Sequence, residues 1–295
     1  MGKRYTAVFY AVLAAALYAI NSPMSKLLLN HIPPVMMAGF LYLGAGIGVF
    51  LLQLGKRAMG KERKELPLTR KELPFTVGMV VLDIAAPVFL MLGLTMTTSA
   101  NASLLNNFEI VATSVIALVI FKEAISPRLW TAIACVTVSS ILLSFEDISS
   151  LSFSWGSLLV LCACICWGFE NNCTRMLSSK DPMEIVIIKG FCSGTGSVLL
   201  ALVSGERCTE PLFILPALLL GFVAYGLSIC FYIYAQRYLG AARTSAYYAV
   251  SPFIGTALSL LIFREQPTVV FFIALVIMII GAWLATERPE KEKLK

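Results

Sequence analysis

Apolar segments of about 20 residues follow one another along almost the whole chain, and short polar segments separate them. A helix of about 20 mostly apolar residues crosses the hydrocarbon core of a bilayer. Pro33, Pro127, Pro182 and Pro267 stand where such helices would begin. The pattern therefore predicts an all-α polytopic membrane protein with ten transmembrane helices, at residues 5–29, 33–54, 74–94, 100–121, 129–145, 155–177, 183–204, 212–235, 243–262 and 267–286.

The composition supports a membrane location. Hydrophobic residues make up 58% of the chain and charged residues 14%, whereas soluble domains carry about 25% charged residues. The net charge of +6 does not indicate nucleic-acid binding, because the basic residues lie in short segments between the apolar ones. We expect membrane lipids as partners and no nucleic acid.

The positions of the basic residues predict the orientation. If the N-terminus is cytoplasmic, all 23 lysines and arginines except Lys26, Lys189, Arg207 and Arg264 fall in cytoplasmic segments. They concentrate in a long basic loop at 55–73 and in a charged tail at 288–295. An excess of basic residues marks the cytoplasmic side. We expect a multi-pass protein of the cell membrane with both termini cytoplasmic (N-in/C-in).

Two parts of the chain resemble each other. A shift of 149 residues aligns Tyr18-Ala19-Ile20-Asn21 with Trp167-Gly168-Phe169-Glu170, and a shift of 142 aligns Phe121-Lys122-Glu123 with Phe263-Arg264-Glu265. We expect five-helix repeats at residues 1–146 and 147–287. Because five is an odd number, the second repeat enters the membrane inverted. Many secondary transporters are built from inverted repeats and bind substrate where the repeats meet.

These motifs resemble the drug/metabolite transporter superfamily, and most closely its EamA-type ten-helix transporters. The resemblance implies a basket of helices around a central cavity, with the fifth and tenth helices at the periphery. It also implies transport of metabolites such as amino acids, amines or nucleosides. The chain departs from the family pattern at Glu109-Ile110, where the ninth helix has Ser251-Pro252. The missing proline predicts a straighter fourth helix.

Ionisable residues inside a membrane are costly and usually face a cavity or a partner. Asp83 lies in the middle of the third helix, one turn before Pro87. We expect it to face the cavity or to relay protons; a hydrogen bond that packs helices is the alternative. Glu109 shares a helix face with Asn106 and Thr113. We expect this stripe to form a substrate or proton site, and polar contacts between helices are again the alternative.

Polar residues occur at the same depth in both predicted repeats, at Asn21 and Glu170. Glu170 also lies at a depth where it could pair with Lys189, and we predict a structural or gating ion pair. Tyr225 and Tyr232 are seven residues apart and share a helix face. They are candidates to stack on a planar or cationic substrate.

Glycines in the second and seventh helices predict close helix packing. Gly44, Gly46 and Gly48 lie in mid-span, and Gly190 and Gly194 lie in the matching helix. Small residues of this spacing let helix backbones approach each other in membranes.

These features predict a secondary active transporter that exports small polar metabolites, such as amino acids or amines, by alternating access. We expect a small-molecule substrate, proton coupling or exchange, and a monomer or homodimer. The alternatives are a flippase for a lipid-linked substrate and an intramembrane enzyme. No HExxH or GxSxG motif occurs, so we expect no catalytic residues. The spacing of Cys162, Cys164 and Cys166 does not suit a metal site, and we expect no cofactor.

Overall fold

The computed structural model describes residues 2–59, 66–122, 126–147, 152–177, 180–239 and 247–285. Within these residues, eight helical segments are long and apolar enough to cross a membrane. They are Tyr5–Leu28, Pro34–Ala58, Arg70–Met96, Ser99–Ile120, Pro127–Ser144, Trp155–Met176, Pro182–Val203 and Pro211–Tyr232. Two shorter apolar helices follow, Ser251–Phe263 and Val269–Ala285.

Each segment predicted to span the membrane contains a helix, although several segments are divided. Residues 243–246 and 286 of the predicted ninth and tenth helices lie outside the described residues, as does the tail 288–295. The elements are α1 (Gly2–Ala19), α2 (Asn21–Leu28), α3 (Pro34–Ala58), η1 (Arg70–Glu72), α4 (Leu73–Met96), α5 (Ser99–Leu105), α6 (Phe108–Phe121), α7 (Pro127–Ser144), β1 (Phe145–Asp147), β2 (Ser152–Phe153), α8 (Trp155–Met176), α9 (Pro182–Ile188), η2 (Lys189–Ser193), α10 (Gly194–Val203), η3 (Pro211–Phe213), α11 (Ile214–Gly221), η4 (Phe222–Leu227), α12 (Ser228–Leu239), α14 (Ser251–Phe263) and α15 (Val269–Ala285).

The predicted fourth helix is divided by a tighter turn. It divides into α5 and α6 at Asn106 and Asn107. The amide of Asn107 donates to the carbonyl of Leu104 at 3.2 Å, and that of Glu109 to the carbonyl of Asn106 at 3.1 Å. These three-residue spacings are those of a 3₁₀ turn, and the turn forms without a proline.

Two other predicted helices contain wider turns. The π-helical segments η2 and η4 interrupt the predicted seventh and eighth helices. Such segments keep the backbone hydrogen-bonded inside the helix, as a membrane requires, and they occur often at functional sites. A two-stranded antiparallel ribbon, β1 with β2, joins α7 to α8. This ribbon is a small departure from the all-α prediction.

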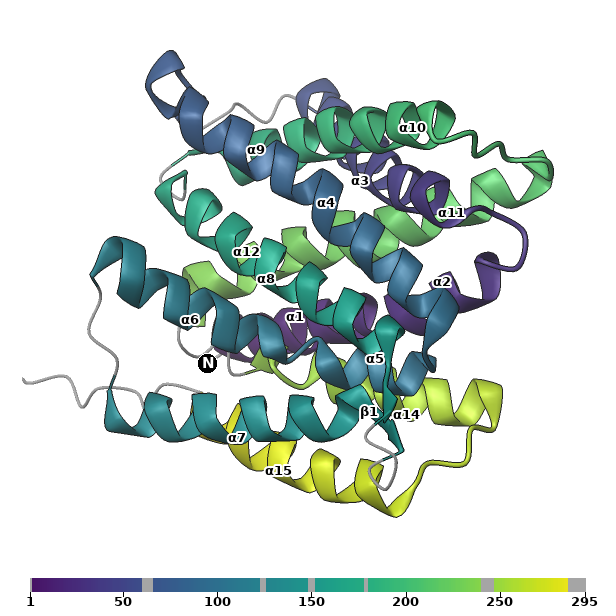
Figure 1. Cartoon of the computed structure of the whole chain (residues 1–295). Coiled ribbons are helices and arrows are strands. Elements are labelled where there is room, and N and C mark those ends of the chain that lie inside the picture. The colour runs from purple at the N-terminus through teal and green to yellow at the C-terminus, as the bar shows by residue number, and fades with distance from the viewer. Residues whose placement is uncertain are drawn as a thin grey trace, which may run out of the picture.

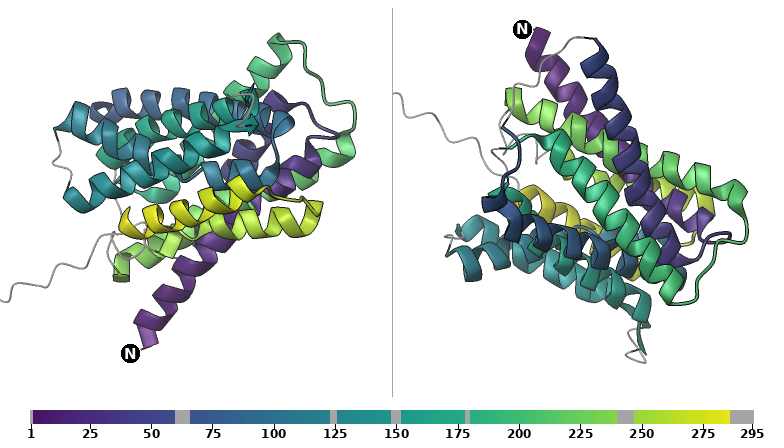
Figure 2. Two further views of the ribbon diagram at one scale, coloured as in Figure 1. Left: turned by 60° about the horizontal axis from the view of Figure 1, so that its bottom comes forward. Right: turned by 90° about the horizontal axis from the view of Figure 1, so that it is seen from above.

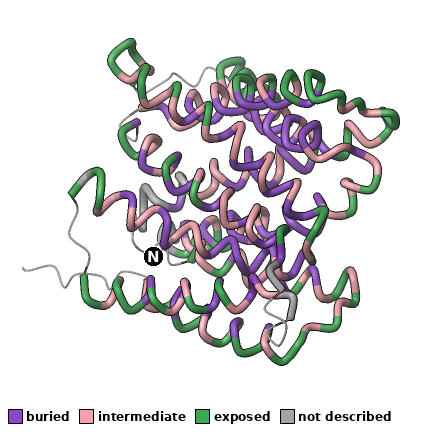
Figure 3. The backbone as a smooth tube through the Cα atoms, viewed as in Figure 1, coloured by how far each residue is buried: buried purple, intermediate pink, exposed green. Residues whose placement is uncertain are grey.

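The helices form one bundle in which α7 and α15 lie together at an edge (Figure 1). The hydroxyl of Ser139 on α7 donates to the carbonyl of Ala274 on α15 at 2.7 Å. The N-terminal part of α1 extends beyond the neighbouring helices in the left view of Figure 2. Buried residues concentrate in the middle of the bundle, and exposed residues line its outside (Figure 3). Many of the exposed side chains are large and apolar, as at Val203 and Leu261, which suits contact with lipid.

The backbone of helix α3 lies in direct contact with backbone atoms of the second half of the chain. A Cβ atom added to Gly44 would lie 2.0 Å from the carbonyl oxygen of Leu218 on α11. One added to Gly190 would lie 2.2 Å from the Cα atom of Gly46. The predicted small-residue packing face is therefore confirmed. Gly55, near the end of the same helix, has open space around it instead.

This difference predicts opposite effects of one substitution at two places on α3. Gly44→Ala should destabilise the protein by about 1–3 kcal/mol, because backbone atoms must move to admit the methyl group. Gly55→Ala should stabilise it by about 0.5–1 kcal/mol, because alanine is the better helix former and nothing is displaced. Thermal unfolding of the two purified variants tests this. Equal melting temperatures would contradict the close packing of α3.

Candidate functional site

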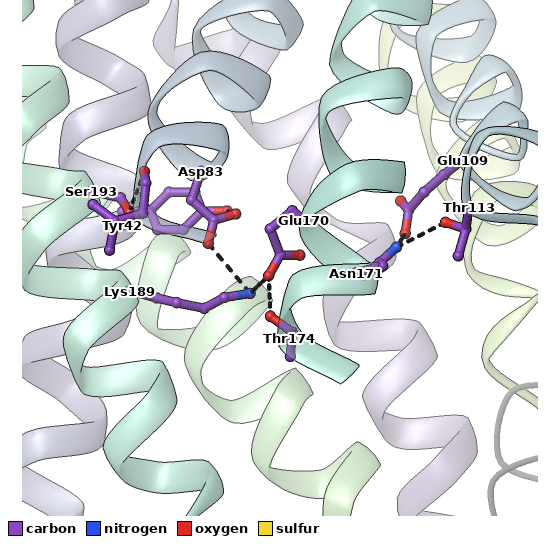
Figure 4. Close-up of polar contacts among 10 residues, drawn as sticks. Tyr42, Asp83, Glu109, Thr113, Glu170, Asn171, Thr174, Lys189 and Ser193 are labelled. Atoms are coloured by element: carbon purple, nitrogen blue, oxygen red, sulfur yellow. Dashed lines mark hydrogen bonds and ion pairs between the residues drawn. The ribbon is translucent and has the colours of Figure 1, made fainter. Parts of the chain in front are cut away.

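A lysine ammonium group lies between two carboxylates in the middle of the bundle (Figure 4). Lys189 Nζ is 2.6 Å from Oε1 of Glu170 and 3.3 Å from Oδ2 of Asp83. The three residues come from η2, α8 and α4. Their exposed fractions are 9%, 3% and 0%. The structure thus brings together Asp83, Glu170 and Lys189, which the sequence singled out separately.

Hydroxyl groups hold the two carboxylates in place. The phenol of Tyr42 on α3 donates to Oδ1 of Asp83 at 2.8 Å. The hydroxyl of Thr174 donates to Glu170 from one turn further along α8. The hydroxyl of Ser193 on η2 donates to the carbonyl of Val80 on α4 at 3.1 Å, which joins the element that carries Lys189 to the element that carries Asp83.

The local sequence explains how these side chains meet. Lys189 opens a π-helical segment, and α4 continues through Pro87 one turn after Asp83. Proline has no amide hydrogen, so the helix loses one internal hydrogen bond beside the carboxylate. Both local features are irregularities within apolar spans, and both lie next to a charged residue.

A second polar cluster surrounds Glu109 on α6. The amide of Asn171 on α8 donates to Oε1 of Glu109 at 2.6 Å and to the hydroxyl of Thr113 at 3.2 Å (Figure 4). The neighbouring amide of Asn172 donates to the carbonyl of Thr113 at 3.2 Å. The predicted stripe on the fourth helix therefore faces α8, which carries Glu170 as well.

Asn106, predicted to share the face of Glu109, lies at the break between α5 and α6. It is buried, and its Oδ1 atom has no hydrogen-bond partner among the described residues. Asn107, beside it, is also buried, and its Oδ1 atom likewise lacks a partner in the described part of the chain.

The predicted residues Asn21 and Tyr225 meet in a third contact. The amide of Asn21 on α2 donates to the phenol oxygen of Tyr225 on η4 at 3.1 Å. The ring of Tyr225 lies 5.3 Å from that of Tyr42 and 5.8 Å from that of Tyr18. Tyr225 therefore links its own cluster to the phenol that holds Asp83.

Tyr232, predicted to share a face with Tyr225, packs its ring edge-on against Tyr248, with centroids 5.1 Å apart. Tyr225 itself lies within the π-helical segment η4.

Sequence reasoning missed three contributors: Tyr42, Tyr18 and Asn171. A tyrosine in mid-span, as at position 42, needs a partner for its hydroxyl, and that requirement is a signal the sequence offered. The contact of Asn171 with Glu109 depends on how α6 and α8 are rotated against each other, which no single segment shows.

Comparisons with known proteins agree with this architecture. The sequence model of the EamA-like transporter family matches residues 5–145 and 154–286. The chain belongs to the EamA-like transporter family. An uncharacterized transporter of Methanothermobacter thermautotrophicus is 25% identical over 289 residues, which cover 92% of this chain and 84% of that protein. A protein of known crystal structure, 16% identical, shares the fold with a TM-score of 0.67 over 95% of each chain.

Membership in the EamA-like family identifies a multi-pass membrane transporter rather than an enzyme. The polar clusters described above therefore belong to a protein whose activity is to move something across a membrane. Within such a protein, charged residues at membrane depth usually mark the path of the substrate or of a coupling ion.

Because Lys189 is shared by two carboxylates, the folding stability of the protein should depend strongly on the charge of this lysine. Lys189→Met should cost about 3–5 kcal/mol, because it leaves two buried carboxylates unpaired. Adding Asp83→Asn and Glu170→Gln to that variant should restore much of the loss, since the neutral side chains need no counter-ion. Unfolding measurements in one detergent test both expectations.

Lys180→Met is a suitable control, since Lys180 pairs with Glu72 in a loop at 3.3 Å. It should have a much smaller effect. If Lys189→Met were no more damaging than this control, Lys189 would not be the required counter-ion.

Proposed function

We propose that the protein is a secondary active transporter that exports small polar metabolites, such as amino acids or amines, by alternating access. The observation that carries this proposal is the ion network of Asp83, Glu170 and Lys189, which joins elements of both halves of the chain. Residues that bind or couple in such a transporter must lie where the halves meet and must be able to exchange partners.

The proposed transporter crosses the membrane ten times as two inverted repeats, residues 1–146 and 147–287. The two segments that match the family, 5–145 and 154–286, correspond to these halves. Helices α6 and α14 are each followed directly by a residue with a left-handed backbone. These residues are Lys122 and Arg264, with φ of 57° and 51°. The 142-residue shift aligns these two positions, and a positive φ is uncommon for residues other than glycine.

The packing of helices supports the same repeat. Helix α1 packs against α12, and α8 packs against α4; α1 also packs against α14, and α8 against α6. Since α8 is the proposed equivalent of α1, these contacts form matching pairs. Contacts between α3 and α10, α5 and α14, and α7 and α15 join each proposed helix to its own equivalent. A two-fold relation between the halves produces this pattern.

In the proposed orientation the protein spans the cell membrane, and both of its termini lie in the cytoplasm. The asymmetry of the basic residues supports it. With this orientation, export requires the site to open first towards the end that carries the loop 55–73.

Contacts between the halves exist at both ends of the bundle. At the proposed cytoplasmic end, the amide of Asp181 donates to the carbonyl of Leu66 at 2.9 Å, and Lys180 pairs with Glu72. The amide and the hydroxyl of Thr69 also donate to the Glu72 carboxylate, at 2.8 and 2.6 Å.

At the opposite end, Glu206 accepts from the amide of Met36 at 2.9 Å, and Glu210 lies 3.1 Å from His31. Alternating access would break one set of these contacts at a time. The proposed partners are a small-molecule substrate, membrane lipids and protons, with the protein working as a monomer or homodimer.

A stability screen followed by transport in proteoliposomes tests the proposal. Amino acids, amines or nucleosides should raise the melting temperature, and the stabilising compound should be transported. Asp83→Asn and Glu109→Gln should each slow transport about tenfold or more, as expected from loss of a hydrogen bond to a charged group, or change its pH dependence. Thr131→Val, at an exposed hydroxyl on α7, is the control.

Two outcomes would count against the proposal. If transport and its pH dependence were unchanged in both Asp83→Asn and Glu109→Gln, these residues would not form the site. If lipids stabilised the protein and no water-soluble metabolite did, the flippase alternative would replace the exporter.

A further inference from the structure

The three carboxylates in the middle of the bundle are not neutralised equally. Asp83 and Glu170 share the ammonium group of Lys189. Glu109 has the neutral amide of Asn171 as its hydrogen-bond partner. Within the described residues, no lysine, arginine or histidine nitrogen lies within ion-pair distance of Glu109. A carboxylate charge in this environment is stabilised by a positive counterpart, and no described side chain supplies one to Glu109 by direct contact.

The surroundings of Glu109 offer hydrogen-bond acceptors without donors to match. Oδ1 of Asn106 and Oδ1 of Asn107 are buried and unpartnered in the part of the chain that the structure describes. The exposed fractions of these residues are 8% and 2%. The Nδ2 group of Asn107 is already engaged with the carbonyl of Leu104 at 3.1 Å, so its oxygen is the free end. A buried acceptor without a donor costs free energy, and a ligand with several N–H groups would remove that cost.

The backbone places one of these acceptors, Asn106, near the carboxylate. The amide of Glu109 donates to the carbonyl of Asn106 across the turn that separates α5 from α6. Asn106 and Glu109 are three residues apart and so share a face of the chain. Glu109 is partly exposed, unlike Asp83 and Glu170, so it is the most accessible of the three carboxylates.

The protein already shows how it holds an ammonium group. Lys189 Nζ is bound by carboxylate oxygens at 2.6 and 3.3 Å, and a tyrosine hydroxyl supports one of these carboxylates. The Glu109 cluster likewise combines a carboxylate with polar side chains that donate to it or lie beside it, but among the described residues no lysine contacts this carboxylate.

We propose that Glu109 and Asn106 form the subsite for the ammonium group of the transported metabolite, which supplies the positive charge that Lys189 supplies to the other two carboxylates. This inference rests on the proposed transport function and narrows the substrate to compounds that carry a primary ammonium group.

Binding of simple probes to the purified protein tests the subsite. Butylammonium and phenethylammonium should raise the melting temperature of the wild type, whereas butanol and phenethyl alcohol should not. Glu109→Gln should weaken binding of both ammonium probes by about tenfold or more, since a charged hydrogen bond is lost. Asn106→Leu should weaken it less, because it removes a neutral acceptor. Glu210→Gln should bind as the wild type does.

Several results would overturn the subsite. The alcohols could raise the melting temperature as much as the ammonium probes do. Alternatively, Glu109→Gln could bind the ammonium probes as tightly as Glu210→Gln does. Stabilisation by sodium over potassium, with no response to the organic probes, would mean an inorganic-cation site. If neutral or anionic metabolites were transported and ammonium compounds were not, the subsite would fail while the transport function stood. If no solute were transported, the proposed function itself would fail.

A second measurement uses only the wild type, in case the variants do not fold. Dicyclohexylcarbodiimide modifies carboxyl groups in apolar surroundings, and peptide mass spectrometry locates the modified residue. Phenethylammonium should protect Glu109 from modification, and phenethyl alcohol should not. Protection by both compounds, or by neither, would contradict the assignment.

Discussion

The structure depends on the neutralisation of charge inside an apolar bundle. A single ammonium group, that of Lys189, compensates carboxylates from two other helices, Asp83 and Glu170. Because an unpaired charge at membrane depth is costly, these helices cannot separate or rotate independently while the network is intact. The phenol of Tyr42 adds α3 to the same network. Four elements distant in sequence are therefore fixed relative to one another by one small group of atoms.

The proposed repeat is symmetric in its helices but not in its charges. The shifts of 149 and 142 residues align Asn21 with Glu170 and Tyr225 with Asp83. In one pair the neutral side chains bond to each other directly, at 3.1 Å. In the other pair the carboxylates face each other through Lys189. The same helix contact is thus neutral on one side of the bundle and ionic on the other. Of these two contacts, only the ionic one can change by exchanging a proton or a cation.

The sequence was enough to predict the apolar helices, the polar residues inside them and the pairing of Glu170 with Lys189, since hydropathy and depth can be read along the chain. It could not predict the break at Asn106 and Asn107 or the wider turns of η2 and η4. An apolar segment satisfies its backbone equally well as a regular helix or with a π-helical turn, so composition does not distinguish them. Contacts such as that of Asn171 with Glu109 depend on helix rotation, which tertiary packing decides.

One backbone-to-backbone contact between the halves lies beside the ion network. Gly190 follows Lys189 in η2, and its backbone meets Gly46 of α3 so closely that no Cβ atom would fit. Packed interfaces of this kind tolerate rotation better than separation, because small displacements across them cause clashes or voids. Under the proposed rocking motion, the axis should therefore pass near Gly46 and Gly190. The network of Lys189 would then move little, while the ends that hold Asp181 and Glu206 move most. Glu109, on the other side of α8, lies further from this axis and would change its surroundings more than Asp83 does.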